Sequence, residues 1–298
     1  MKNVKWTINS VLNWTQKYLQ NTRPSSSRLD AELLLAFVLG CNRLDLYLRA
    51  DQPLNPQELR DYRELIRHRS IGCPVAYLTG EKEFWSLKLE VNKNTLIPRP
   101  DTETLVEHAL NQIRNWQKKN PKDTCKIVEL GTGTAAIPLA LCSELKNLKI
   151  ISVDCNEKIL KVASRNLRRH NSLLKQRKND VNLLISNLFS GINQKEKLDF
   201  IISNPPYIPS HSIDYLQDEI SRYEPRLALD GGRDGLDFYR YLLKSASNFL
   251  TLKGKMLLEL GQFKEIELIS IQKKYKAWRK SEFFEDLRGN LRVWKLSK

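Results

Sequence analysis

The residues best suited to chemistry form the tetrapeptide Asn204-Pro205-Pro206-Tyr207, which follows an apolar run directly. An amide or aromatic amine nitrogen is a weak nucleophile because its lone pair is delocalised. The Asn204 side-chain oxygen and the Pro205 carbonyl could each accept one N–H of such a nitrogen and aim its lone pair for in-line methyl transfer. The prolines stiffen the turn, and Tyr207 offers an aromatic face to the flat acceptor or to a cationic methyl donor. The tetrapeptide therefore predicts a site that binds a planar nitrogen and methylates it.

A second candidate lies upstream, where Gly131-Thr132-Gly133-Thr134-Ala135 joins a strand pattern to a helix pattern. The glycines permit a tight turn and a close approach of the backbone to a ligand. Asp154 ends the next predicted strand, where its carboxylate can accept both hydroxyls of a ribose. The same spacing also fits a dinucleotide fingerprint, so the turn alone predicts a nucleotide-type cofactor without selecting one.

Glu129, two positions before the first glycine, discriminates between the two cofactor classes. A carboxylate there repels a pyrophosphate, whereas it attracts the cationic methionine end of S-adenosylmethionine. We therefore expect S-adenosylmethionine rather than NAD, with Glu129, the glycine turn and Asp154 among its binding residues.

The two loops need a scaffold, and beyond residue 122 strand and helix patterns alternate, as in a parallel sheet covered on both faces. If the fourth strand neighbours the first, both loops meet at the carboxyl edge of the sheet, where open α/β sheets bind ligands. Strands are predicted at 126–130, 148–154, 181–186, 198–203 and 255–260, helices from about 136, at 157–170 and at 236–249, and a final helix–strand pair ending at Val293.

The first 85 or so residues have helical periodicity instead, which predicts a small bundle of three helices. Residues 83–91 alternate as a strand, with 92–94 as the turn of a hairpin, and Asp101 is expected to cap the next helix. The expected fold is α/β, a Rossmann-like methyltransferase sheet with a small N-terminal helical domain and a β-hairpin linker. Helices are predicted at 4–19, at 29–39 with Gly40 as C-cap, and at 56–69, and the domains at 1–82 (helical, substrate-docking), 83–97 (hairpin linker) and 98–298 (methyltransferase).

The composition indicates where the protein works and which partners it has. No apolar run approaches the roughly 20 residues that cross a bilayer, and the N-terminus lacks a signal-peptide core, so we expect a cytoplasmic protein without membrane contact. Five scattered cysteines and four dispersed histidines predict reduced thiols and no metal site. The net charge of +15 favours interaction with a polyanion, either nucleic acid itself or a partner that works beside it. A basic stripe on helix 157–170 could meet phosphates or form a solvated face.

Over nearly its whole length, the sequence resembles the HemK/PrmC-type protein-(glutamine-N5) methyltransferases. The tetrapeptide alone is shared with enzymes that methylate adenine in DNA, so it does not select the substrate. Two other segments, TLIPRPDTE and YEPRLALDGG with its continuation, are far more restrictive. The similar segments are TLIPRPDTE (95–103), the glycine turn, the tetrapeptide, YEPRLALDGG (223–232) with DGLD (234–237), and DLRGNLRV (286–293).

The resemblance implies transfer of a methyl group from S-adenosylmethionine to the glutamine of the Gly-Gly-Gln loop in bacterial class 1 release factors. Residues 131–135 and Asp154 would hold the cofactor, and the stretch 186–189, with Asn187 and Leu188, would edge its adenine. Residues 204–207 would bind the glutamine, and the helical domain would help to dock the release factor. We expect a monomer that works transiently near the ribosome.

The chain departs from the family pattern at three positions. Ala135 stands where a third glycine is usual, and Asn187 and Leu188 stand where an acidic and often an aromatic residue are usual. Three alternatives stay open. The enzyme could methylate a glutamine of a large-subunit ribosomal protein, it could be a DNA or RNA amino-methyltransferase, or the chain could be an inactive scaffold that binds a translation factor.

Overall fold

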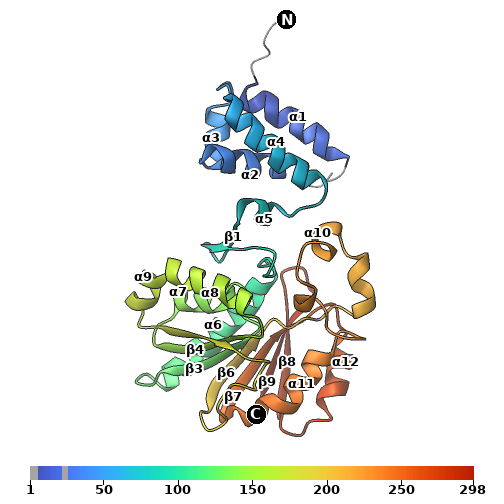
Figure 1. Ribbon diagram of the computed structural model, residues 1–298. Coiled ribbons are helices and arrows are strands. Elements are labelled where there is room, and N and C mark those ends of the chain that lie inside the picture. Colours follow the sequence, from blue (N-terminus) through green and yellow to red (C-terminus); the bar gives the residue numbers. More distant parts are fainter. Residues whose placement is uncertain (1–5, 22–25) are drawn as a thin grey trace, which may run out of the picture. The chain divides into compact units, whose positions relative to one another are not determined.

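The computed structural model describes residues 6–21 and 26–298, which divide into two compact units (Figure 1). The helical unit comprises Met1–Glu81 together with Gln217–Tyr223, and the sheet unit comprises Lys82–Leu216 together with Glu224–Lys298. The chain therefore returns to the helical unit once, in a segment that sequence patterns did not single out. Within the described ranges, no helix is both long and apolar enough to cross a membrane.

Apolar side chains at helical spacing build the core of the helical unit, among them Leu12, Leu34 and Ile66. Gly40 adopts the predicted left-handed C-cap conformation, with φ 61°. Two short helices, α3 and α5, were not predicted because five or six residues are too few to display a helical period. The helices are α1 (Ile8–Gln20), α2 (Ser27–Leu39), α3 (Arg43–Leu48), α4 (Pro56–Ser70), α5 (Val75–Thr79) and α10 (Asp218–Ser221); residues 4 and 5 of the first predicted helix lie outside the described residues.

Buried charges in the helical unit are matched by opposite charges. The Arg69 guanidinium, with a side chain only 4% exposed, contacts Asp30 and Glu219, each at 2.7 Å. This contact holds the returning segment Gln217–Tyr223 within the unit. Burial acts to raise the pKa of Glu32, but the hydroxyl of Tyr47 and two arginines bound to the carboxylate lower it below its usual value.

The hairpin that opens the sheet unit turns at a different place from the predicted one. Strands β1 (Glu81–Phe84) and β2 (Leu87–Glu90) pair around Trp85 and Ser86, both with positive φ, so the prediction of a turn at 92–94 is wrong. Such turns normally carry Asn or Gly, and this one lacks that signal. Its Trp85 backbone N–H donates to Glu103 at 3.1 Å and its indole N–H to Glu144 at 3.2 Å. These long-range contacts stabilise a turn that local chemistry does not favour.

The sheet of the second unit has seven strands in the order β5-β4-β3-β6-β7-β9-β8. The first five are parallel, and β9 and β8 add an antiparallel edge. The first and fourth strands, β3 and β6, are neighbours, which is the condition under which the two site loops were expected to meet. The final helix–strand pair is corrected to a helix followed by two strands. The strands are β3 (Cys125–Leu130), β4 (Leu148–Asp154), β5 (Asp180–Ile185), β6 (Leu198–Ser203), β7 (Leu250–Glu259), β8 (Lys280–Glu285) and β9 (Leu291–Ser297).

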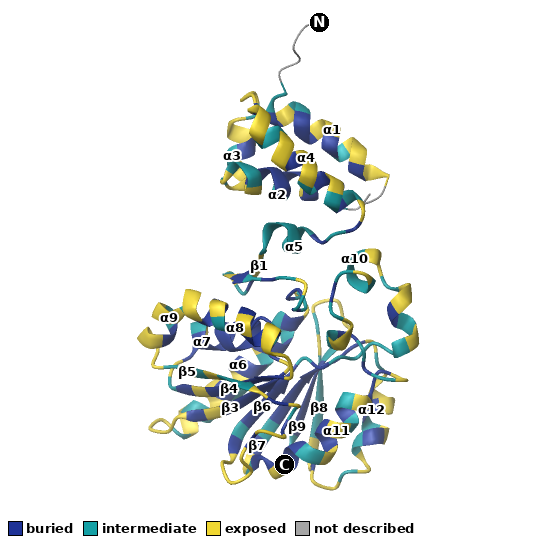
Figure 2. Ribbon diagram, in the orientation of Figure 1, coloured by how far each residue is buried: buried dark blue, intermediate teal, exposed yellow. Residues whose placement is uncertain are grey.

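Helices cover both faces of this sheet, so its central strands are buried throughout (Figure 2). Ile127 and Phe200 face the layer of α6 and α7, whereas Val128 and Ile201 face the layer of α11 and α12. Burial on both faces explains the continuous apolar runs. The helices are α6 (Thr102–Lys119), α7 (Ala136–Glu144), α8 (Glu157–Arg169), α9 (Asn171–Gln176), α11 (Asp237–Ser245) and α12 (Glu265–Gln272), with 3₁₀ turns η1 (Ser210–Tyr215), η2 (Arg226–Ala228) and η3 (Ala246–Asn248).

The start of α6 departs from the sequence prediction. Asp101 occupies the N-cap position, but its side chain makes no capping hydrogen bond. The carboxylate lies 3.1 Å from the Arg292 guanidinium instead, in an ion pair with β9. A long-range charge partner has replaced the local cap.

Candidate active site

The two predicted loops meet at the carboxyl edge of the sheet. Leu130 and Ser203 are register partners at the ends of β3 and β6, and the Ser203 hydroxyl donates to the Leu130 carbonyl at 2.7 Å. A methyl group placed on Gly131 would lie 3.9 Å from the Asn204 carbonyl oxygen. The glycine turn and the tetrapeptide are therefore direct neighbours, as the strand order requires.

A cavity of about 270 Å³ opens beside this junction, within the sheet unit. Seven residues predicted for cofactor or substrate binding line it, and they come from the ends of four strands, β3, β4, β5 and β6. They are Gly131, Gly133, Asp154, Asn187, Leu188, Asn204 and Pro206.

Asp154 links the glycine turn to the cavity. One carboxylate oxygen accepts the Gly133 N–H at 3.1 Å, and the other accepts the Cys155 N–H at 2.9 Å. Burial raises the pKa of Asp154, and these backbone donors act in the opposite direction. A carboxylate offers about four lone-pair sites, so the oriented group can still accept ligand hydroxyls.

Glu129 lies beneath the turn rather than on the cavity wall. It is 2% exposed, it accepts the Thr132 hydroxyl at 2.5 Å, and it is absent from the described residues that line the cavity. Burial raises its pKa to about 8, and the negative charge of Asp154 acts in the same direction. A cation in the cavity would favour the ionised form, so its binding would release a proton.

The rest of the turn is buried and shapes the backbone. Asn166 of α8 is fully buried, and its side-chain N–H donates to the carbonyls of Thr134 and Glu90, each at 3.0 Å. Ala135, at φ 62° and ψ 31°, adopts the left-handed conformation just before α7. That conformation explains the usual glycine at this position, because a β-carbon there is strained.

The transfer end of the site presents an oriented amide. The Asn204 Nδ2 group donates to the Thr102 hydroxyl oxygen at 3.1 Å, which leaves the Asn204 Oδ1 atom available to accept. Pro205 is buried and Pro206 lines the cavity. Tyr207 is turned elsewhere, since a methyl group on Gly261 would lie 2.5 Å from its ring. Burial raises the pKa of Tyr207, as expected for a ring packed inside the unit.

Several cavity residues were not assigned a role from the sequence. Glu224 connects the two segments that contribute most of them, because it accepts the Ile97 N–H at 3.1 Å and pairs with Arg99. Both segments belong to the blocks that carry the family resemblance, and this resemblance was the sequence signal that could have assigned them to the site. The unassigned residues include Lys93, Asn94, Thr95 and Leu96 of the connector, Pro225, Leu227 and Ala228 of the second block, and Ile159 and Phe238 from α8 and α11.

The basic stripe on α8 is partly occupied by ion pairs. Lys161 lies 2.9 Å from Glu157, and Arg165 lies 2.6 Å from Glu90 of the hairpin. These contacts favour a solvated face with structural pairs over a surface that binds phosphates.

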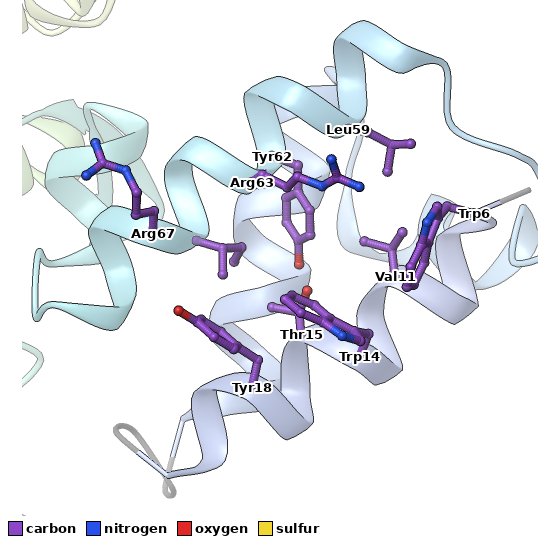
Figure 3. A pocket seen from close by; sticks show the side chains of 10 residues that line it. Trp6, Val11, Trp14, Thr15, Tyr18, Leu59, Tyr62, Arg63 and Arg67 are labelled. Carbon is purple, nitrogen blue, oxygen red and sulfur yellow. The ribbon is translucent and has the colours of Figure 1, made fainter. Parts of the chain in front are cut away.

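The helical unit has a cavity of its own, about 360 Å³ in volume, between α1 and α4 (Figure 3). Trp14 and Tyr18 stack with ring centroids 5.1 Å apart, and Trp14 is 49% exposed. Arg63 and Arg67 also border the cavity. Exposed aromatic rings beside arginines are typical of surfaces that bind other proteins.

Two family models match the chain. The PrmC N-terminal domain matches residues 10–80, and the Methyltransferase small domain matches residues 108–224. The chain is also 38% identical to the release factor glutamine methyltransferase of Geobacter sulfurreducens over 256 residues, which cover 86% of this chain and 84% of that protein. The chain belongs to the release factor glutamine methyltransferase family. A second family member, from Rhodopirellula baltica, is 34% identical over 98% of this chain and 97% of its own length.

One solved structure of another protein shares the fold of this chain. The hMettl16 catalytic domain, in complex with a MAT2A 3′UTR hairpin, aligns with a TM-score of 0.51 and 15% identity, over 78% of this chain and 81% of that one. At this identity the likeness establishes a shared fold alone.

The donor set of the cavity fits S-adenosylmethionine, the cofactor of these methyltransferases. Asp154 is an oriented acceptor for hydroxyls, Leu188 and Ile159 are apolar surfaces for a flat base, and Glu129 lies behind the turn as a carboxylate that a cation would ionise. A dinucleotide pyrophosphate finds no Lys or Arg side chain beside the turn except Lys93 among the described lining residues.

Proposed function

We propose that this enzyme transfers a methyl group from S-adenosylmethionine to the side-chain amide nitrogen of the glutamine in the Gly-Gly-Gln motif of bacterial class 1 release factors. One observation supports it above all. Asn204, whose side-chain oxygen is left to accept, lines the same cavity as the Gly131 turn, and its backbone carbonyl lies beside that turn. Acceptor nitrogen and cofactor would meet there.

The cofactor would be held by a small set of side chains and backbone groups. Asp154 would accept the ribose hydroxyls, while Asn187 and Leu188 would border the adenine. Gly131 and Gly133 would let the backbone approach, and the buried Thr132, Thr134 and Ala135 would shape the turn from behind. When bound, S-adenosylmethionine supplies an electrophilic methyl group on a sulfonium.

The glutamine would be held by two acceptors, the Asn204 side-chain oxygen and the Pro205 carbonyl. Together they would orient the amide nitrogen and stabilise the positive charge that develops on it. The nitrogen becomes acidic only after methylation, so no base is needed before attack. Tyr207, packed against Gly261, would position the end of the tetrapeptide.

We also infer that the enzyme acts as a cytoplasmic monomer, transiently near the ribosome, where release factors work. The net charge of +15 supports such company, because a basic enzyme is attracted to anionic particles.

The helical unit would dock the body of the release factor. Its cavity between α1 and α4 supports this role, since Trp14 and Tyr18 present aromatic area and Arg63 adds positive charge at the rim. The expected partner surface is therefore acidic with an apolar centre.

Docking can be separated from chemistry with two acceptors. The Trp14→Ala variant should raise KM for an intact release factor by about tenfold, while methylation of a short Gly-Gly-Gln peptide stays unchanged. Phe37→Ala is the matched control, because Phe37 is 50% exposed and lies outside the cavity. Equal KM values for Trp14→Ala and Phe37→Ala on the intact factor would exclude docking at this cavity.

The function itself is tested by offering labelled S-adenosylmethionine with three acceptors. They are a release factor, the same factor with its Gly-Gly-Gln glutamine changed to alanine, and a mixture of unmethylated DNA and ribosomal RNA. Label on the first alone is expected. Label on the alanine variant would move the target to another residue, and label on nucleic acid would establish an amino-methyltransferase instead.

A further inference from the structure

A buried glutamate ends the strand next to the tetrapeptide, and the mechanism above does not use it. Glu259 is the last residue of β7, and Leu258 before it is the register partner of Ser203. Its side chain has no exposed surface, and neither carboxylate oxygen has a hydrogen-bond partner of standard geometry within the described residues. A buried acceptor without a partner destabilises the fold, and more so when it is charged, so its presence calls for a role.

The groups around Glu259 lead toward Asn204. Burial raises the pKa of Glu259 to about 7, and the nearby Thr102 hydroxyl and the Arg292 charge act in the opposite direction. The same Thr102 oxygen accepts the Asn204 Nδ2–H at 3.1 Å. Glu259, Thr102 and Asn204 therefore form a series that ends at the cavity.

The direction of hydrogen bonding in such a series is set by its first member. An ionised carboxylate can only accept, so a hydroxyl facing it must donate. Thr102 then has only lone pairs left for Asn204, which must present its NH₂ group to Thr102. The Asn204 oxygen is thereby turned toward the site.

We propose that Glu259 is a positioning residue for methyl transfer: it orients the Thr102 hydroxyl and so keeps the Asn204 oxygen directed at the acceptor amide. Glu259 lies outside the cavity lining, so it acts through Thr102 and not on the substrate. Hydrogen bonds in unliganded sites are often poorly aligned and tighten in the substrate complex, and we expect the same of the contact between Glu259 and Thr102. The proposal rests on the proposed function, since the orientation matters only for an N–H acceptor.

A pH dependence follows from the same geometry. A protonated Glu259 could donate to Thr102 and release the constraint on Asn204. With a pKa of about 7, the group loses its ordering effect as the pH falls below that value. The other charged or titratable groups facing it are Asp101 before α6, Tyr207 after β6, Tyr239 on α11 and Arg292 on β9. Of these, Asp101 opposes ionisation of Glu259, and Arg292 promotes it.

The decisive variant is Glu259→Gln. The glutamine side chain has nearly the same shape as glutamate, but its amide can donate as well as accept, so it no longer forces the Thr102 hydroxyl to donate. We expect kcat for release factor methylation to fall by roughly tenfold to a hundredfold, with KM and cofactor affinity little changed. The loss of rate below neutral pH should be present in the wild type and absent in the variant. A wild-type kcat and pH profile in Glu259→Gln would overturn the proposal.

Substitutions at Thr102 give a test that leaves Glu259 unaltered. Thr102→Ser keeps the hydroxyl and should retain most of kcat, whereas Thr102→Val should lose as much as Glu259→Gln. The double variant should be no slower than either single one, because one series is interrupted in each case. Additive losses would mean that the two residues act separately.

Tyr239→Phe is the matched control for damage to the end of β7. The Tyr239 hydroxyl donates to the Glu259 backbone carbonyl at 2.7 Å, so its loss perturbs the same residue without touching the carboxylate. It should lower thermal stability and leave kcat intact. If kcat fell equally in Tyr239→Phe, strand distortion would explain the effect. A wild-type enzyme that fails to methylate the factor would instead refute the proposed function.

Discussion

Two buried glutamates of the sheet unit differ from the buried carboxylates of the helical unit and from Glu224 of the sheet unit, which pairs with Arg99. In the helical unit, Asp30 and Glu32 each meet arginine side chains at 2.6–2.7 Å. In the sheet unit, Glu129 and Glu259 lie at the carboxyl ends of strands and take part in no ion pair among the described residues. Burial raises their pKa values to about 8 and about 7.

The difference separates charges that hold the fold from charges that act at the site. A paired charge is satisfied and fixes a local arrangement, whereas an unpaired one is poised to respond to a cation or to an oriented substrate. Groups with strongly shifted pKa values gather at functional sites for this reason. Both unpaired glutamates flank the junction of Gly131 and Asn204.

The largest effect is expected where a paired charge loses its partner. Arg69→Met leaves Asp30 buried without a counter-charge, which should lower the free energy of unfolding of the helical unit by about 3–5 kcal/mol. Urea denaturation measures it. Arg67→Met on the same helix removes an exposed pair with Glu64 and should change nothing measurable. Equal stability of the two variants would contradict the claim that the buried ion pairs hold the helical unit together.

At the site, Asn204→Ala should affect rate rather than stability. Losing the oriented acceptor should reduce methyl transfer by about 10²–10³-fold, while S-adenosylmethionine binds nearly as before. Single-turnover methylation and calorimetric titration measure the two quantities. Transfer at the wild-type rate would remove Asn204 from the chemistry.

Asp154→Ala should act on the cofactor instead. Loss of a charged acceptor for hydroxyls should weaken binding by about 1.5–3 kcal/mol, roughly ten- to a hundredfold in Kd. Calorimetry with S-adenosylmethionine checks this value. Unchanged affinity would refute the ribose assignment.

The unpaired glutamates also predict how stability depends on pH. Because burial raises the pKa of Glu129 to about 8, the folded protein keeps a proton that the unfolded chain has lost above its ordinary pKa near 4.5. The free energy of unfolding should therefore fall as the pH rises between these values. Denaturation of the ligand-free protein at pH 5 to 8 tests the sign. In Glu129→Gln the free energy of unfolding should depend less on pH. An unchanged dependence would mean that another group causes it.

The smallest effect is expected at the strained turn. Ala135→Gly relieves a left-handed alanine at φ 62° but removes a buried methyl group, so the two terms largely offset each other. We expect a stabilisation below about 1 kcal/mol in thermal unfolding. A clear destabilisation would show that packing of the methyl group outweighs the strain.

The elements that follow local rules were predictable. The parallel strands and both site loops were predicted because each apolar run ends in its own polar loop, and Gly40 was predicted because a helix end favours glycine. The turn at Trp85 and Ser86 was missed because its stability comes from Glu103 and Glu144, far along the chain. The Asp101 cap failed for the same reason, through Arg292.

The sequence by itself determined the chemistry at each strand end, because glycines, prolines and an amide express their properties within a few residues. Only the tertiary structure decided that Glu129 lies beneath the turn, that Tyr207 faces Gly261, and that Thr102 binds Asn204 and lies near Glu259. Those relations join residues more than 50 positions apart or depend on burial. Tertiary packing determines both these long-range contacts and the burial of the residues, and a local sequence pattern predicts neither.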